Sequence, residues 1–94
     1  MEKLVVLTLA VPYRSPGNVI RQKDVVFEIF RDFDTYCITP QLPKNERRLA
    51  DLPEHLEFTL KNNKPKIHMD ITVGNFHIIL ALVQLLQEQH IITD

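Results

Sequence analysis

The chain begins with a continuous hydrophobic stretch. Residues 4–11 read LVVLTLAV, a run rich in leucine and valine that ends at Pro12. A run without polar alternation is typical of a strand that is covered on both faces. We therefore expect a strand at the centre of a sheet here. The following Ser-Pro-Gly-Asn at residues 15–18 predicts a chain reversal, because proline and glycine suit the corners of a turn.

Residues 19–33 fit two patterns. The β-branched and aromatic side chains at residues 25–30 favour a strand, whereas Val26, Ile29, Phe30 and Phe33 also match a helical stripe. A hairpin through residues 15–18 is the shortest connection, so we prefer the strand, followed by a turn at 31–34 and another strand at 35–39. The alternative, a helix over 19–33, would give a ferredoxin-like split βαβ arrangement.

Residues 40–71 predict a long connection followed by a hairpin. Three prolines within residues 40–55 indicate a loop, which surrounds a short helical turn that we expect Asn45 to cap. Alternation then becomes strict, and the apolar positions are Leu56, Phe58, Leu60 on one side of residues 61–64 and Ile67, Met69, Ile71 on the other. This pattern predicts a β-hairpin with one apolar and one polar face.

The last part of the chain has helical periodicity. Residues 75–89 place most of their apolar side chains in one wide arc and leave only a narrow polar stripe. Residues 90–93 are either the frayed end of this helix or a short edge strand. Together, the patterns predict a single α+β domain over residues 1–94, an antiparallel sheet of four or five strands with the C-terminal helix packed on one face.

The width of the apolar arc raises the question of what covers the helix. One face of a sheet covers about half of a helix, so a further element or another chain must cover the rest. We predict an interface for self-association at Phe76, Ile79, Leu82 and Leu86. The alternative is that the loop of residues 40–55 folds across the helix. Membrane insertion is not expected, because polar residues interrupt the uncharged run of residues 71–87, which is short for a spanning helix.

Charge gives no bulk argument for nucleic-acid binding. The 94 residues carry 11 Lys and Arg against 12 Asp and Glu, a formal net charge of −1. Several cations nevertheless fall in or beside the two polar loops, and these form a candidate basic patch if the loops share one end of the sheet: Arg14, Arg21, Lys44, Arg47 and Arg48. Acidic residues are interleaved with them, which favours a mixed solvated surface.

Candidate catalytic chemistry is sparse. The four histidines and Cys37 follow no metal-ligand spacing, and the two glycines cannot form a phosphate-binding loop. We expect Cys37 to be a small core residue, since it lies in an apolar and aromatic stretch. A lone cysteine forms no intramolecular disulfide, which favours a cytoplasmic location. No catalytic residue, metal or cofactor is predicted.

Three functions remain in order of preference. The first is a non-catalytic interaction or regulatory module, a homodimer whose helix and sheet edge contact a partner. The second is an accessory protein that binds nucleic acid through the loop cations. The third is a small enzyme that uses Cys37 or a histidine.

Overall fold

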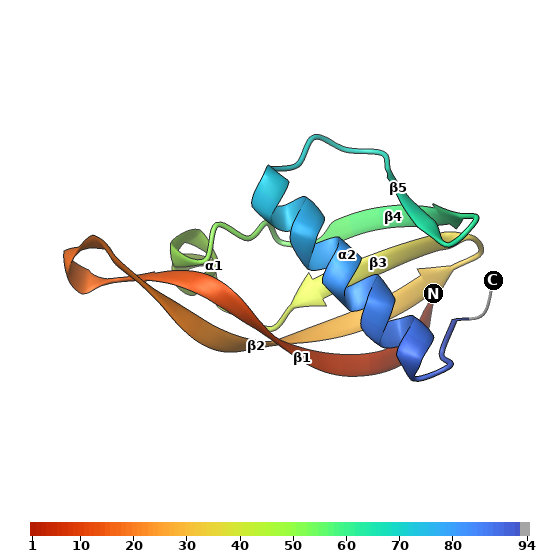
Figure 1. The fold of residues 1–94 in the computed structure, drawn as a ribbon, viewed down its shortest axis with the longest axis horizontal. Helices are drawn as coiled ribbons and strands as arrows, with labels where there is room; N and C mark the ends of the chain where they lie inside the picture. The colour runs from red at the N-terminus through yellow and green to blue at the C-terminus, as the bar shows by residue number, and fades with distance from the viewer. Residues whose placement is uncertain (93–94) are drawn as a thin grey trace.

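The first two strands form one long hairpin (Figure 1). In the computed structural model, which describes residues 1–92, β1 (Glu2–Ser15) and β2 (Val19–Asp32) are antiparallel partners from end to end. The reversal is a 3-10 turn at Pro16–Asn18, in which φ is 84° at Gly17 and 61° at Asn18. The predicted reversal is confirmed, and residues 19–32 form the preferred strand, with Phe33 in the turn that follows. The helical alternative is wrong, because the β-branched side chains of β2 lie opposite those of β1.

Each strand pairs with its neighbours in sequence. The remaining strands are β3 (Thr35–Pro40), β4 (Leu56–Lys61) and β5 (Lys64–Ile67), and the sheet order is β1-β2-β3-β4-β5. A five-stranded antiparallel sheet and a C-terminal helix agree with the predicted α+β class, and the ferredoxin-like alternative is wrong.

The expected central position of the first strand is also wrong. β1 lies at an edge, and Val6 is 44% exposed, so its apolar run is not covered on both faces.

The second hairpin is shorter than its sequence pattern predicts. Asn62 and Asn63 form its turn with φ of 53° and 65°, the positive angles that two-residue hairpin turns require. β5 ends at Ile67, which lies opposite Phe58. The predicted extension through Met69 and Ile71 is wrong, because the chain leaves the sheet there to reach the second helix. Met69 is accordingly exposed.

The long connection contains a short helix, α1 (Lys44–Leu49). Its N-cap is Pro43, whose carbonyl accepts from the backbone N–H groups of Glu46 and Arg47 at 3.0 and 2.9 Å. The prediction that Asn45 caps this turn is therefore wrong by two residues. The Pro43 carbonyl already accepts the first hydrogen bonds of the helix, so Asn45 lies inside the helix and not at its N-cap.

The C-terminal helix α2 (Val73–Glu88) begins two residues earlier than predicted. Its N-cap is Thr72, whose Oγ1 accepts from the backbone N–H of Asn75 at 3.1 Å. At the other end, His90 has φ of 56°, and the N–H of Ile91 returns to the carbonyl of Leu86 at 2.9 Å. Residues 90–92 form no strand, and residue 93 lies outside the described part.

Within residues 1–92, no helix is long and apolar enough to cross a membrane.

One hydrophobic core joins the strands to α2. Alternate strand positions contribute to it, and we call their side chains inner and those between them outer. Tyr36 and Phe58 stack at the centre of the sheet, with ring centroids 5.3 Å apart. The fully buried side chains are Val11, Val25, Phe27, Ile29, Ile38, Leu56, Phe58, Ile79, Leu82 and Leu86.

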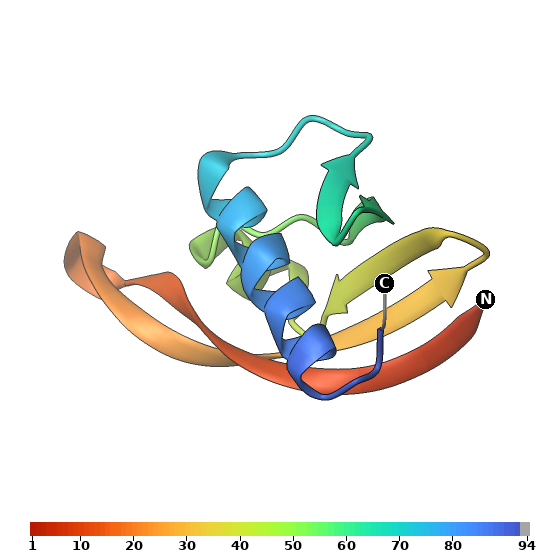
Figure 2. The same ribbon diagram turned by 45° about the vertical axis from the view of Figure 1, so that its right-hand side comes forward.

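The sheet curls around the helix. Among the strands, the backbone of α2 lies nearest to β1 and β5, the first and last strands of the order. Figure 2 shows β4 and β5 turned up at an angle to the β1–β2 hairpin, with α2 crossing between them. Strand twist accumulates across neighbours and produces this shape. A curled sheet reaches more of the circumference of a helix than a flat sheet does.

Candidate interaction surfaces

The predicted interface on α2 lies largely inside the domain. Ile79, Leu82 and Leu86 have no exposed surface, and only Phe76, at 36%, reaches solvent. The other large exposed apolar residues of α2 are Val73 and Leu80. The curl of the sheet accounts for this, because strands at both edges cover the helix. A partner that contacts α2 therefore meets Val73, Phe76 and Leu80 instead of the buried arc.

The two edges of the sheet differ strongly. β5 has four residues and carries Lys64, Pro65 and Lys66, three features that discourage pairing with another strand. β1 has fourteen residues and no charge between Lys3 and Arg14. Its backbone pairs only with β2, and no hydrogen bond from the rest of residues 1–92 reaches its other side. A register shift between Lys3 and Val5 and the proline at residue 12 limit this edge, so β1 presents an edge free of charge, bulge and proline over residues 5–11.

The outer side chains next to this edge are small and uncharged. Val6, Thr8 and Ala10 lie exposed on β1, and Val26 of β2 lies opposite Thr8. On β2, charged residues flank Val26: Glu28 lies opposite Val6, Asp24 lies opposite Ala10, and Lys3 Nζ contacts the Glu28 carboxylate at 2.8 Å. The outer face of β1 and β2 thus combines exposed apolar side chains with the free edge.

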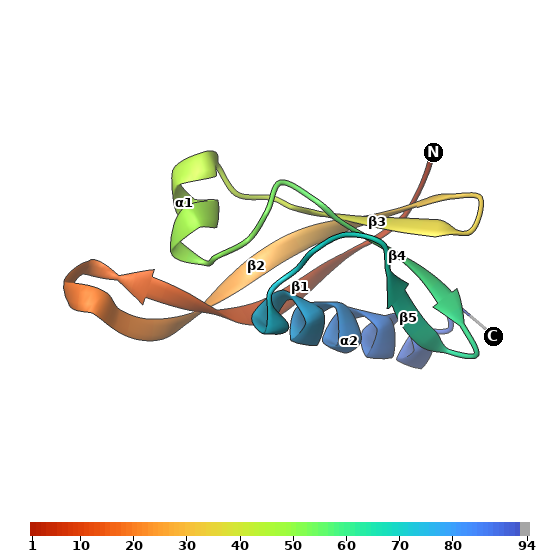
Figure 3. The ribbon, with the colours of Figure 1, turned by 90° about the horizontal axis from the view of Figure 1, so that it is seen from above.

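The candidate basic residues gather at one end of the molecule. Arg14 and Arg21 lie on the half of the β1–β2 hairpin that projects beyond the sheet, and α1 lies beside that half (Figure 3). Lys44 and Arg48 of α1 are exposed. The two polar loops therefore lie at the same end of the sheet, the arrangement on which the predicted basic patch depends.

Local contacts occupy two of the basic side chains at this end of the molecule. Lys23 Nζ lies 3.1 Å from the Glu46 carboxylate and 5.0 Å from the centroid of the Tyr13 ring, which ties α1 to the hairpin. Arg47 Nη1 donates to the Leu42 carbonyl at 3.2 Å. Arg47 thus has a structural contact, whereas Arg14, Arg21, Lys44 and Arg48 extend into solvent.

Cys37 is half-buried at an outer position of β3, so its expected place in the core is wrong. Its inner neighbours Tyr36 and Ile38 occupy the core instead. Burial raises the pKa of the Cys37 thiol, the negative charge of Glu57 on the facing strand raises it further, and a hydrogen bond with Thr39 lowers it. The net pKa is raised, so the thiolate fraction at neutral pH is smaller than for a free cysteine.

The histidines do not converge on one site. His68 lies 3.0 Å from the Thr59 hydroxyl, and His55 lies 3.5 Å from Glu57. His77 is exposed on α2, as its place in the polar stripe predicts. No group of three or more His, Cys, Asp or Glu side chains within residues 1–92 is arranged to hold a metal ion.

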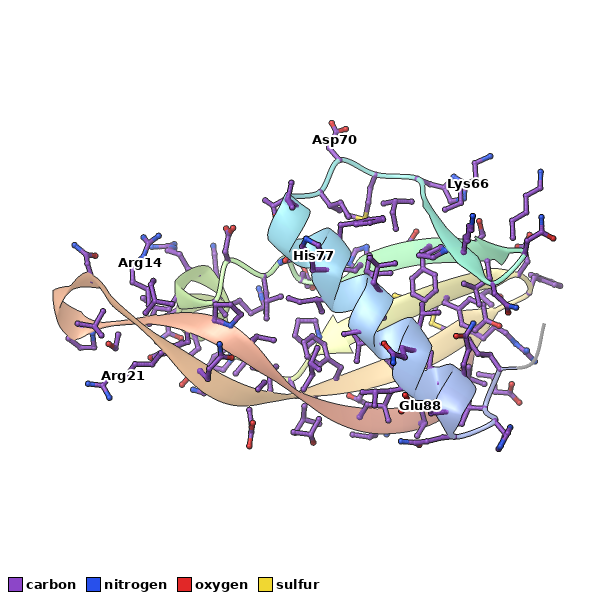
Figure 4. The ribbon with its side chains drawn as sticks, in the orientation of Figure 1. Arg14, Arg21, Lys66, Asp70, His77 and Glu88 are labelled. Carbon is purple, nitrogen blue, oxygen red and sulfur yellow. The ribbon has the colours of Figure 1, made fainter. Side chains whose placement is uncertain are left out.

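A groove of about 460 Å³ lies between the projecting hairpin, the end of α1 and the first half of α2. Arg14, Asp51 and His77 lie at this groove, and Figure 4 shows Arg14 on the hairpin and His77 on α2. The other lining side chains used below are Leu9, Pro12, Ile20, Leu49, Asn75, Ile78 and Ala81. Asn75 is the buried polar residue of the described chain, at 6% exposure.

Sequence patterns did not identify this groove. Asn75 was expected at the start of the helix, where polar residues are usual, and nothing in the pattern distinguished it from a solvated residue. The spacing of Thr72 and Asn75 was the available signal, since a threonine three residues before a polar residue marks a helix N-terminus.

Comparison of the chain with protein-family models, curated proteins and solved structures gives no match.

Proposed function

We propose that this protein is a non-catalytic interaction module that forms a homodimer through the free edge of β1. The difference between the two sheet edges carries the proposal. β5 is short and protected by lysine and proline, whereas β1 is long and uncharged from residue 4 to residue 13. Unprotected edges of this length are prone to pair with another strand.

A second copy satisfies the geometry of this edge. Two β1 strands related by a twofold axis pair in antiparallel fashion, and each supplies the backbone groups that the other lacks. With α2 packed on the inner face of each sheet, the outer faces join into one surface. Val6, Thr8 and Ala10 of the two copies then lie beside one another and bury the exposed apolar side chains.

The chemistry of the side chains favours binding over catalysis. The raised pKa of the Cys37 thiol is opposite to the lowered value that a nucleophilic cysteine requires. A cytoplasmic location accompanies this proposal, since a single reduced cysteine is stable there.

Lysine at outer positions of the edge strand tests the dimer. We expect the double variant Val6→Lys/Thr8→Lys to raise the dimer dissociation constant about tenfold or more, because like charges then lie close together across the new pairing. Both side chains are exposed in the monomer, so the fold is retained. Light scattering over a concentration series measures the change.

Val26→Lys provides the matched control. It places the same charge on the same outer face, but on β2, which already has strands on both sides. We expect its dissociation constant to stay within about twofold of the parent protein, since surface substitutions away from the contact have small effects. A monomeric parent protein at every concentration, or equal effects of the two lysine variants, would refute pairing through the β1 edge.

A second candidate function is nucleic-acid binding at the basic end. The gathering of Arg14, Arg21, Lys44 and Arg48 on neighbouring elements favours it, and Tyr13 on the same hairpin offers a ring for base stacking. Against it, Glu46 lies on α1 and Asp51 follows α1 by two residues, so the positive potential is reduced.

Retention on immobilised single-stranded DNA tests this candidate. If it holds, Lys44→Ala/Arg48→Ala lowers retention at low salt and reduces the slope of log K against log salt by about one to two, since two phosphate contacts are lost. Lys64→Ala/Lys66→Ala, at the opposite end of the sheet, is the control and leaves retention unchanged. Equal retention of both variants contradicts a role for the basic end.

A further inference from the structure

We propose that the groove beside α2 binds a small organic acid, a molecule with an apolar body and one carboxylate. The groove shares Ala10 with the outer positions at which β1 is proposed to pair, whereas Val6 and Thr8 do not line it. Its volume of about 460 Å³ falls within the range of pockets that hold small molecules.

The side chains that line the groove are mostly apolar, and they favour a ligand with an apolar body. Ile20 of β2 is 61% exposed, and Leu49 of α1 is also exposed, although both line the groove. Leu9, Ile78 and Ala81 continue this apolar lining. A ligand seated here covers side chains that the fold itself leaves in water, and this burial favours binding.

Asn75 supplies the first polar contact. This residue lines the groove and is 6% exposed, and its side-chain amide has no hydrogen-bond partner within residues 1–92. Its backbone N–H is already used by Thr72, so only the side chain is free. Within residues 1–92 no fully buried side-chain polar atom lacks a hydrogen-bond partner, so the Asn75 amide reaches the solvent of the groove and is available to a ligand.

The start of α2 favours an acceptor that is negatively charged. The backbone N–H groups of Val73 and Gly74 have no acceptor within the helix, and the positive end of the helix dipole lies there. Gly74 lines the groove, and the only atom within 4 Å of an added Cβ there is Thr72 Oγ1, at 3.9 Å. This leaves space for a ligand atom next to the backbone. Arg14, across the groove on β1, adds a positive charge.

Asp51 opposes this preference from the end of α1. It lines the groove, but it is exposed, so water screens its charge more than it screens a buried group. Its presence yields a directional expectation. Removing its charge increases the affinity for a carboxylate and leaves the affinity for a neutral ligand of the same length unchanged.

The test compares octanoate with 1-octanol at pH 7.5, both well below the concentration at which they aggregate. Backbone amide chemical shifts of the full chain report binding and its location. We expect octanoate to bind at least about tenfold more tightly than 1-octanol, because only the carboxylate gains from the helix terminus and Arg14. The shifted amides should belong to residues 9–14, 49–51 and 72–78.

Asn75→Asp separates binding from folding. An acidic residue in the first turn of a helix is favourable, which offsets part of the cost of placing a carboxylate at a position that is 6% exposed. The melting temperature and the retained binding of 1-octanol show that the variant is folded. Octanoate should lose most of its affinity through repulsion, while 1-octanol retains its affinity. Asp51→Asn should strengthen octanoate binding by about twofold to fivefold, the effect of a screened surface charge.

Two outcomes would overturn the proposal. One is the absence of shifts at the groove with either ligand. The other is equal affinity for octanoate and 1-octanol that Asn75→Asp leaves unchanged, which would show an apolar groove without selection for an acid. Val6→Lys/Thr8→Lys should bind octanoate normally, so failure of the dimer proposal and failure of this one are distinguishable.

Discussion

Replacing Phe58 with alanine should lower the free energy of unfolding by about 3 to 5 kcal/mol. Phe58 is fully buried, it stacks on Tyr36, and it lies between β3 and β5 in the sheet. Its removal leaves a cavity beside Tyr36 in the core, and the surrounding structure closes such a cavity only in part. Chemical denaturation followed by circular dichroism measures the change.

Phe33→Ala is the matched control for this loss. Phe33 is 94% exposed in the turn between β2 and β3, with φ of 58°. The same atoms are removed, but no buried contact is lost, so the change should lie within about 0.5 kcal/mol. A loss at Phe58 as small as that at Phe33 would mean that the stacked pair does not belong to the core.

The second large effect is expected on α2. Leu82→Glu places a carboxylate at a position with no exposed surface, and the desolvation of one unpaired charge costs several kcal/mol. Together with the lost packing, this is comparable to the whole stability of a small domain. We expect the variant to lack the dispersed proton NMR spectrum of a folded protein at 25 °C.

Leu80→Glu tests whether burial, and not helix propensity, causes this effect. Leu80 lies on the same helix, two residues earlier, and is partly exposed. The variant should fold with a melting temperature within about 5 °C of the parent protein, since a surface change of this kind costs little. Unfolding of both variants to the same extent would contradict the assigned orientation of α2.

Local patterns predicted the elements of this fold better than their arrangement. The alternation at Leu56, Phe58 and Leu60 identified β4 because a half-buried strand must alternate. The run of residues 4–11 was assigned to the centre of the sheet, although it forms an edge. An apolar run shows that surface is to be buried, and it does not show whether the fold or another chain buries it.

The same distinction explains what could be predicted of the surfaces. The basic residues were identified because charge is visible in the sequence, and their convergence depended only on two loops sharing one end. The interface on α2 was placed at Phe76, Ile79, Leu82 and Leu86 because one sheet face was expected to cover only half of the helix. The curled sheet buries the last three of these residues. The groove depends on the path of the projecting hairpin past α1 and α2, which no local pattern encodes.

The order of the elements along the chain also determines when the core is completed during synthesis. The five strands are made first, and each pairs with the strand before it, so the hairpins can form as they emerge. The apolar side chains on their inner face, however, have no cover until residues 73–88 have left the ribosome. The nascent sheet therefore exposes its inner face to water until nearly all of these 94 residues are made, the period in which aggregation competes most strongly with folding.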